Sequence, residues 1–329
     1  MKLIAFGMRK DEVGFAEEWA QANQIDVEIT GDLLTTDTIN QAKGFDGIIA
    51  LQTIPYDDAL FSEMQKMSIK VLSVRNVGVD NIDLVAAKKH NIMVTNVPAY
   101  SPNAIAEFSV TQLMQLLRKT PEFNLKLKAN DYRWAPNISR ELRSLTVGVI
   151  GTGRIGRVAM DIYKGFGAKV IAYDLHPKPE LKEAGLYADS LDDLFEQADV
   201  ITLHAPATKE NEHMLNRDTF AKMKQNVLIV NTARGTLINT EDLIDALKSG
   251  QVGGAALDTY EFENPIFNHD LSHVDIEDPL FNELLGMTNV ILTPHIAFYT
   301  ETAVKNMVEI AFNSAQQFLT TGAVETEVK

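Results

Sequence analysis

Short apolar runs alternate with amphipathic stretches over the first hundred residues of the chain. The runs have the length of buried strands, and stretches such as Glu12–Ala22 and Asp83–Lys89 have the apolar spacing of helices. This alternation predicts a small parallel α/β domain. The predicted strands are Lys2–Phe6, Ile25–Ile29, Asp46–Leu51, Lys70–Val74 and Ile92–Val94.

A second alternating series begins at Thr146 and contains six further candidate strands. Six strands separated by helical stretches match a doubly wound nucleotide-binding sheet. The predicted strands are Thr146–Ile150, Lys169–Tyr173, Val200–His204, Val227–Asn231, Val252–Leu257 and Val290–Leu292. The chain is therefore predicted to be an α/β protein with two parallel sheets.

Two long helical patterns flank the second series. Ser101-Pro102 opens the first, with serine at the N-cap and proline at the first helical position. It carries enough apolar residues for an interdomain or intersubunit surface. The other runs from Glu301 to about Leu319. It follows the second series in the sequence, yet nothing in its pattern prevents it from packing on the first.

Length and composition favour a globular protein with two domains. The chain has 329 residues, more than one core usually organises. Hydrophobic residues make up 45% and charged residues 23%, as in ordinary soluble proteins. No apolar run approaches the roughly 18 residues of a membrane span. Met1 leads directly into a strand-like run without the features of a signal peptide, so a cytoplasmic location is expected.

Charge and cysteine content narrow the possible partners. A formal net charge of −15 argues against nucleic acid and anionic membranes. It still allows a small anionic substrate, because exposed charges are screened beyond about 8 Å at physiological salt. The chain has no cysteine, which excludes disulfides and thiolate metal ligands. No metal site is predicted.

A glycine motif follows the first strand of the second series. Gly151, Gly153 and Gly156 form a GxGxxG fingerprint between that strand and a helical stretch over Arg157–Phe166. The first glycine allows a tight turn, the second lets the backbone approach a pyrophosphate, and the third lets helix and strand pack closely. The helix N-terminus adds partial positive charge. In this βαβ context the motif predicts a dinucleotide site rather than a plain glycine-rich turn.

Asp174 ends the next predicted strand and indicates which dinucleotide is bound. A carboxylate at this position accepts hydrogen bonds from the adenosine ribose, whereas a 2′-phosphate would meet it as a like charge. No arginine follows directly, although His176 and Lys178 can soften the repulsion. NAD is therefore the expected cofactor, in preference to NADP.

Three residues near predicted strand ends suggest redox chemistry. Arg234 follows one strand and can hold a carboxylate bidentately, while Glu263 and His295 follow the next two. A histidine can transfer a proton near neutral pH, and a neighbouring carboxylate fixes its tautomer. Each residue alone is more often a surface ion pair, a solvated loop residue or a packed histidine. Together behind a dinucleotide fingerprint, they predict a nicotinamide-dependent acid–base site.

At this point the sequence resembles the D-isomer-specific 2-hydroxyacid dehydrogenases, and most of all their bacterial members that act on D-lactate and D-2-hydroxyisocaproate. The resemblance extends over essentially the whole chain. The segments that carry it are Arg75–Asp83, Asn96–Pro102, Gly151–Gly156, Thr232–Gly235, Glu263 and Thr293–His295.

The resemblance implies a role for each matching position. Arg234 would grip the carboxylate and carbonyl of a 2-oxo acid, His295 would protonate the carbonyl oxygen, and Glu263 would pair with His295. The backbone amides of Val77 and Gly78 would cradle the carboxylate. Positions that the family uses for NAD are Arg154, Ile155, Ala205, Pro206, Asn211, Thr232, Ala233, Arg234 and Asp258, besides the three glycines and Asp174.

The resemblance also implies a domain arrangement. Residues 1–100 and 299–329 would form a smaller, flavodoxin-like, doubly wound substrate domain, with the last helix returning to it. Residues 101–298 would form a Rossmann-type, doubly wound NAD domain. A homodimer through the helix after Ser101 is the family expectation. A non-catalytic NADH sensor on the same fold is the alternative from another class.

Substrate size depends on fewer residues. Leu51 resembles the position where lactate-specific relatives carry tyrosine and branched-acid enzymes carry leucine, so a branched or aromatic 2-oxo acid is expected rather than pyruvate. Discrimination of this kind contributes only about 1–3 kcal/mol, so D-lactate dehydrogenase activity stays the alternative. Tyr100 and Tyr299 are further candidates to line the substrate pocket, with core packing as the competing role.

Overall fold

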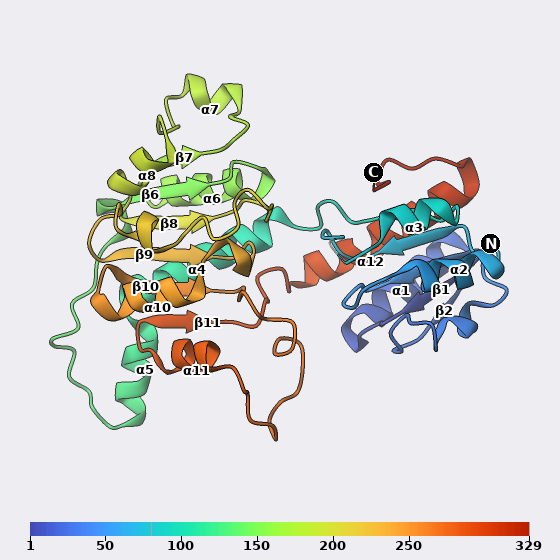
Figure 1. Cartoon of the computed structure of the whole chain (residues 1–329), viewed down its shortest axis with the longest axis horizontal. Helices are drawn as coiled ribbons and strands as arrows, with labels where there is room; N and C mark the ends of the chain where they lie inside the picture. Colours follow the sequence, from blue (N-terminus) through green and yellow to red (C-terminus); the bar gives the residue numbers. More distant parts are fainter. Residues whose placement is uncertain (80, 329) are drawn as a thin grey trace. The chain divides into compact units, whose positions relative to one another are not determined.

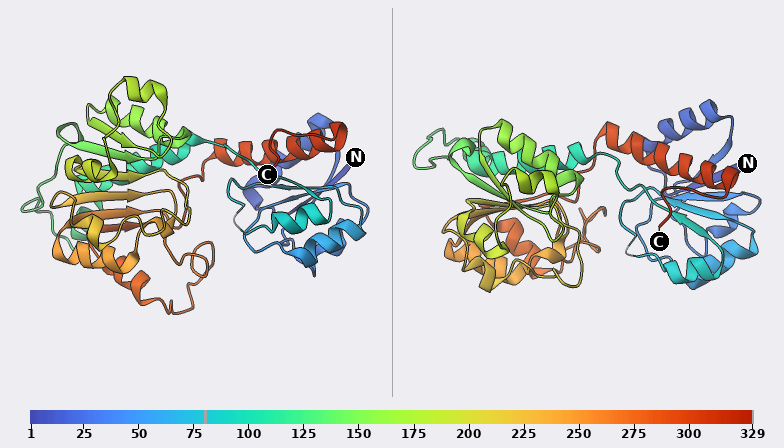
Figure 2. Two further views of the ribbon diagram at one scale, coloured as in Figure 1. Left: turned by 45° about the horizontal axis from the view of Figure 1, so that its top comes forward. Right: turned by 90° about the horizontal axis from the view of Figure 1, so that it is seen from above.

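The computed structural model describes residues 1–79 and 81–328 of the chain. Contacts divide the chain into two compact units. The smaller comprises Met1–Ser101 and Tyr299–Lys329, and the larger comprises Pro102–Phe298. Each unit is a parallel sheet with helices on its faces (Figures 1 and 2). This confirms the predicted fold class.

The sheet of the smaller unit has the strand order β2-β1-β3-β4-β5, with every pair parallel. This is the order of the flavodoxin-like doubly wound sheet. The observed strands lie within one residue of the predicted ends. They are β1 (Lys2–Phe6), β2 (Asp26–Ile29), β3 (Gly47–Ala50), β4 (Val71–Val74) and β5 (Met93–Thr95).

Helices cover both faces of this smaller sheet. Side chains alternate along β1, so that Leu3 belongs to the core under α1 and α12 while Ile4 belongs to the core under α2 and α3. The terminal helix α12 packs against β3, β4 and α1 (Figure 1). Its Phe312 ring lies 5.0 Å from the Trp19 ring of α1. The helices are α1 (Lys10–Asn23), α2 (Asp58–Lys66), α3 (Leu84–Lys89) and α12 (Glu301–Thr321).

The larger unit contains a six-stranded parallel sheet with the order β11-β10-β9-β8-β6-β7. Its strands are β6 (Thr146–Ile150), β7 (Lys169–Tyr173), β8 (Val200–Leu203), β9 (Val227–Asn231), β10 (Val252–Leu257) and β11 (Val290–Leu292). Its helices are α4 (Pro102–Arg118), α5 (Thr120–Lys128), α6 (Arg154–Gly165), α7 (Pro179–Glu183), α8 (Leu191–Gln197), α9 (Arg217–Phe220), α10 (Thr240–Ser249) and α11 (Pro279–Gly286).

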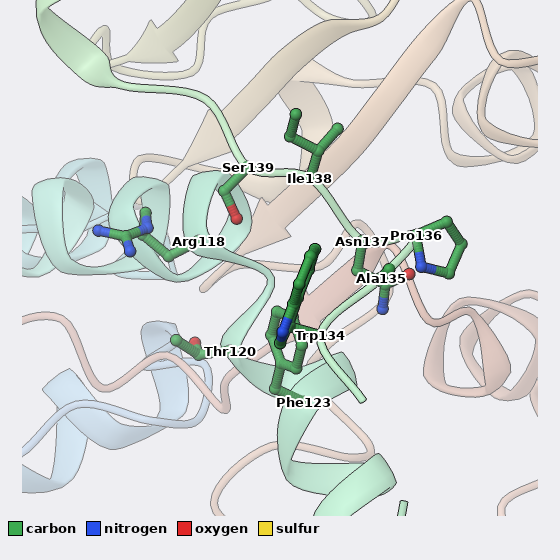
Figure 3. A pocket seen from close by; sticks show the side chains of 9 residues that line it. All are labelled: Arg118, Thr120, Phe123, Trp134, Ala135, Pro136, Asn137, Ile138 and Ser139. Atoms are coloured by element: carbon green, nitrogen blue, oxygen red, sulfur yellow. The ribbon is translucent and has the colours of Figure 1, made fainter. Parts of the chain in front are cut away.

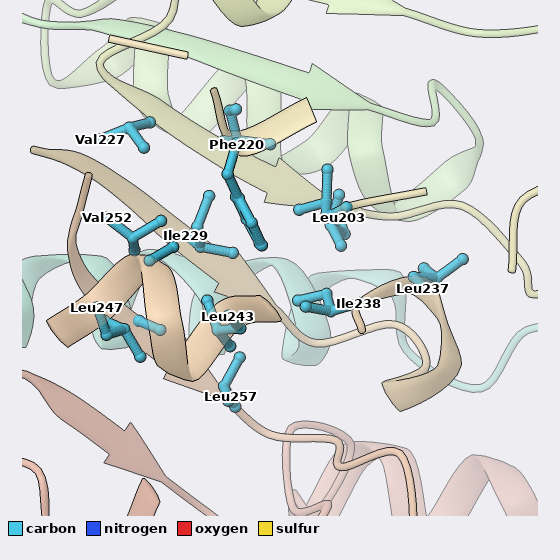
Figure 4. Packing of buried hydrophobic residues seen from close by; sticks show 14 of the residues in the cluster. Leu203, Phe220, Val227, Ile229, Leu237, Ile238, Leu243, Leu247, Val252 and Leu257 are labelled. Atoms are coloured by element: carbon cyan, nitrogen blue, oxygen red, sulfur yellow. The ribbon is translucent and has the colours of Figure 1, made fainter. Parts of the chain in front are cut away.

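Two cores sandwich the larger sheet. Val149 faces the core beneath α4 and α6, and its neighbour Ile150 faces the core beneath α8, α10 and α11. Figure 4 shows the second core, where Leu243 and Leu247 of α10 pack near Ile229 of β9. Strands covered on both faces read as continuous apolar runs, which explains why the sequence revealed them clearly.

The largest error in a predicted boundary is the start of α6. α6 begins at Arg154, three residues before the predicted start at Arg157, because Gly153 already serves as its N-cap. The third glycine of the fingerprint therefore lies inside the first turn of the helix. Among the residues that the structure describes, no helix has the length and apolar character needed to cross a membrane.

Candidate active site

The glycine loop joins β6 to α6 where the strand order of the larger sheet reverses, with β7 on one side of β6 and β8 on the other. Gly151 adopts a φ of +95°, and a Cβ there would lie 2.7 Å from the Ala205 backbone nitrogen. A Cβ at Gly156 would lie 1.9 Å from the Gly151 carbonyl oxygen. Gly153 instead has open space beside it. The loop thus fits a dinucleotide phosphate at a switch point, where open α/β sheets bind ligands.

Asp174 is held at the end of β7 by the glycine loop. Its Oδ2 accepts hydrogen bonds from the Thr152 backbone nitrogen at 2.6 Å and from the Thr152 hydroxyl at 2.9 Å, and its Oδ1 accepts from the His176 nitrogen at 2.8 Å. Partial burial acts to raise the pKa of Asp174, but the hydrogen bonds outweigh it and keep this pKa below its ordinary value. The carboxylate is therefore ionised, as recognition of a ribose requires. Sequence reasoning missed Thr152.

Arg234 follows β9 at the carboxyl edge of the sheet. The buried Asn231 side chain braces its backbone, donating to the Arg234 carbonyl at 2.8 Å and accepting from the Ala233 nitrogen at 3.0 Å. The guanidinium Nη1 donates to the Ala233 carbonyl at 2.8 Å. These hydrogen bonds hold the backbone of Arg234 and one nitrogen of its guanidinium, which favours a directed grip on a carboxylate.

His295 and Glu263 form a hydrogen-bonded pair after β11 and β10. His295 Nδ1 lies 2.7 Å from Glu263 Oε1, and the other carboxylate oxygen accepts from the Tyr260 nitrogen at 2.9 Å. The backbone of His295 adopts a φ of +56°, which is uncommon for a residue other than glycine. With Nδ1 directed at the carboxylate, Nε2 is the nitrogen available for proton transfer.

Asp258 anchors the segment that carries His295. Its Oδ1 accepts from the Thr293 hydroxyl at 2.6 Å and the Ile296 nitrogen at 2.9 Å, and its Oδ2 accepts from the Ala297 nitrogen at 2.8 Å. Its carbonyl accepts from the His295 nitrogen at 2.8 Å. Burial raises the pKa of Asp258 in spite of these bonds. In this structure Asp258 orders the histidine loop, and its contact with NAD stays a prediction.

The remaining predicted NAD contacts border the same switch point. Arg154 and Ile155 lie in the first turn of α6, and Ala205 and Pro206 follow β8. Asn211 closes that loop, donating to the Pro206 carbonyl at 2.8 Å and accepting from the Thr208 nitrogen at 2.7 Å.

Two further polar groups near these loops are buried, the Thr232 hydroxyl and the His204 imidazole. The Thr232 hydroxyl beside Ala233 is buried and has no hydrogen-bond partner among the described residues, as expected of a group that meets a bound ligand. Burial lowers the pKa of His204 to about 4, so that imidazole is neutral and does not compete as a proton donor.

The predicted substrate residues of the smaller unit lie after β3, after β4 and near α12. Val77 and Gly78 follow β4, and Leu51 follows β3. The Asn76 side chain joins these two loops, accepting from the Gln52 nitrogen at 2.8 Å and donating to its carbonyl at 3.1 Å.

The two tyrosines of this set lie beside α12 and the β1–α1 loop. The Tyr100 carbonyl accepts from Asn306 of α12, and the Tyr299 ring lies 5.5 Å from the Arg9 guanidinium. Asp80 of the same family segment lies outside the described residues. That these residues of the smaller unit bind the same substrate as Arg234 and His295 stays a prediction.

Comparison with known proteins decides the family. Residues 110–297 match the family model described as D-isomer specific 2-hydroxyacid dehydrogenase, NAD binding domain. The chain is a member of this family. A D-lactate dehydrogenase from Lactiplantibacillus plantarum is 56% identical to it, over 100% of this chain and 99% of the relative.

Solved structures agree along the whole chain. A D-2-hydroxyisocaproate dehydrogenase has a TM-score of 0.93 and 47% identity, covering 100% of this chain and 99% of that one. The NAD-complexed form of a D-isomer specific 2-hydroxyacid dehydrogenase from Lactobacillus delbrueckii ssp. bulgaricus has a TM-score of 0.91 and 35% identity, with 100% of both chains covered. The protein is thus an NAD-dependent D-2-hydroxyacid dehydrogenase.

In a dehydrogenase of this family, the Glu263 carboxylate is expected to stabilise protonated His295. We expect Glu263→Gln to lower kcat for reduction of a 2-oxo acid about tenfold, or 1.4 kcal/mol, because the amide keeps a hydrogen bond but loses the charge. Steady-state kinetics measures kcat, and a fluorescence titration with NADH should give unchanged affinity. An unaltered kcat would show that the charge of Glu263 plays no part.

Proposed function

We propose that this dehydrogenase reduces pyruvate to D-lactate with NADH, and that Arg234, His295 and Glu263 carry the reaction. The observation that carries this proposal is the His295–Glu263 pair, 2.7 Å between Nδ1 and Oε1, at the same sheet edge as Arg234. The name of the Lactiplantibacillus plantarum relative supports the choice of lactate.

The residues divide the work of binding and proton transfer. Arg234 holds the substrate carboxylate and polarises the neighbouring ketone carbonyl, which makes the carbonyl carbon more electrophilic. When bound, NADH supplies the hydride that this carbon accepts. Protonated His295 gives its Nε2 proton to the carbonyl oxygen, so the product is a neutral hydroxyl group. Glu263 keeps Nδ1 protonated and the ring oriented throughout. The amides of Val77 and Gly78 would complete the grip on the carboxylate.

A larger substrate is the second candidate, and Leu51 favours it. A leucine there leaves more space than a tyrosine, as a branched 2-oxo acid would need. A pocket that differs by a few methylene groups changes the preference between two substrates by only about 1–3 kcal/mol, or 10–200-fold in kcat/KM.

A panel of 2-oxo acids separates the two candidates. The test is to determine kcat/KM with pyruvate, 4-methyl-2-oxopentanoate and phenylpyruvate by following NADH absorbance. The proposal expects the highest value for pyruvate, and a tenfold preference for the branched acid would replace it with the second candidate. Leu51→Tyr serves as the matched variant, because it should depress kcat/KM for the branched acid more than for pyruvate.

A homodimer in the cytoplasm is also part of this proposal. Apolar side chains are exposed along α5 and the segment after it, where Trp134 is 80% and Ile138 87% exposed. Figure 3 shows these two residues lining a pocket with Arg118 and Phe123. Apolar surface of this kind marks interfaces. Sizing the protein in solution should give about twice the 36.5 kDa chain mass.

A further inference from the structure

A second histidine–glutamate pair lies in the larger unit, apart from His295 and Glu263. His213 Nε2 is 2.5 Å from Glu261 Oε1. The other carboxylate oxygen of Glu261 accepts from the Thr240 hydroxyl at 2.8 Å and the Thr240 nitrogen at 3.2 Å. The Glu261 side chain is only 11% exposed, so these donors replace most of its hydration. A carboxylate held this firmly can fix the position of whatever it joins.

Glu261 joins three loops at the carboxyl edge of the sheet. His213 belongs to the loop after β8, Thr240 opens α10 after the Arg234 loop, and Glu261 itself follows β10. Backbone hydrogen bonds also join the first two loops. The His213 nitrogen donates to the Thr236 carbonyl at 2.8 Å, and the Leu215 nitrogen donates to the Leu237 carbonyl at 3.0 Å.

Gly235 ties the loop of Arg234 directly to the turn that contains Glu261. A Cβ at Gly235 would lie 2.1 Å from the Tyr260 carbonyl carbon and 2.4 Å from the Glu261 nitrogen. The two backbones therefore touch at the residue directly after Arg234. The same turn continues to Glu263, whose Oε2 accepts from the Tyr260 nitrogen at 2.9 Å. A shift of Glu261 would consequently move the loop that carries Arg234.

We propose that Glu261, with His213, is a positioning residue that holds Arg234 in register with the His295–Glu263 pair. This inference rests on the proposed function, in which Arg234 grips the substrate carboxylate. The two residues touch neither substrate nor proton. They set the direction of the Arg234 guanidinium. Its grip on the substrate carboxylate depends on geometry, because a misplacement of about 1 Å can cost up to 100-fold in rate.

The test compares Glu261→Gln and His213→Ala with His213→Gln. The first two remove the charged acceptor or its donor, and both should raise KM for pyruvate about tenfold while kcat changes less than about threefold. The glutamine at position 213 retains an amide donor and should restore KM to within about threefold of the unaltered enzyme. The dissociation constant of oxamate, a non-reducible 2-oxo acid analogue, measured calorimetrically with NADH present, should rise in parallel with KM.

His90→Ala is the matched control. His90 Nε2 lies 3.0 Å from Asp58 Oδ1 in the smaller unit, so its loss breaks a similar pair that contacts none of the predicted site residues. It should leave KM unchanged. Wild-type KM and oxamate affinity in both Glu261→Gln and His213→Ala would overturn the positioning role. Failure of the unaltered enzyme to reduce pyruvate would overturn the proposed function instead, and the oxamate comparison does not depend on turnover.

Discussion

His295→Asn is expected to lower kcat for pyruvate reduction by about 10²–10⁴-fold, the range contributed by a positioned general acid. Asparagine matches the first ring nitrogen of histidine, so its amide can still donate to Glu263 as Nδ1 does at 2.7 Å. It also tolerates the positive φ of +56° at this position. The variant therefore keeps a donor to Glu263 and removes Nε2, the nitrogen proposed to deliver the proton.

The measurement is the steady-state rate of NADH oxidation at saturating pyruvate, which gives kcat. A fluorescence titration supplies the control, because Asp174 and the glycine loop are untouched and NADH affinity should persist. A kcat within tenfold of the unaltered enzyme would mean that another group protonates the carbonyl oxygen.

Glu12→Gln is expected to lower the free energy of unfolding by about 3–5 kcal/mol, the cost of leaving a buried charge without its partner. Arg75 and Glu12 are both fully buried, with Arg75 Nε 3.2 Å from Glu12 Oε1. Arg75 also donates to the carbonyls of Phe6 at 3.2 Å and Gly7 at 2.9 Å. Burial lowers the pKa of Arg75, and Glu12 is the charge that opposes this shift.

Chemical denaturation of both proteins measures this difference. Glu63→Gln is the matched control, because Glu63 makes the same kind of ion pair with Lys66 at 2.6 Å on an exposed surface. An exposed pair contributes about 0–1 kcal/mol, so the control should unfold almost as the unaltered protein does. Equal losses of unfolding free energy in Glu12→Gln and Glu63→Gln would show that burial of the Arg75–Glu12 pair adds nothing to the cost of breaking it.

Sequence periodicity predicted the two sheets because most of their strands are buried on both faces. β1, β6, β7, β9, β10 and β11 have the predicted bounds, and no end of the other strands differs from its predicted position by more than one residue. The start of α6 was missed because the glycine fingerprint masks its first turn. A glycine at the N-cap carries no side-chain signal of a helix beginning.

The candidate site was predictable where its residues sit directly at strand ends. Arg234 and His295 follow β9 and β11, so topology alone places them at one edge. Partners that depend on loop packing were not predictable. Thr152 at Asp174 and His213 at Glu261 are brought together by turns whose geometry the pattern of apolar residues does not encode. The burial of Glu12 was likewise not predictable, because a charged residue in the first turn of α1 is expected at the surface.

Stereospecific turnover tests the central claim most directly. The purified enzyme is mixed with NADH and pyruvate, absorbance at the reduced-nicotinamide band is followed, and the product is resolved by chiral chromatography. The account predicts loss of NADH with formation of D-lactate only. Absence of turnover with every 2-oxo acid of the panel, or formation of an L-hydroxy acid, would contradict it.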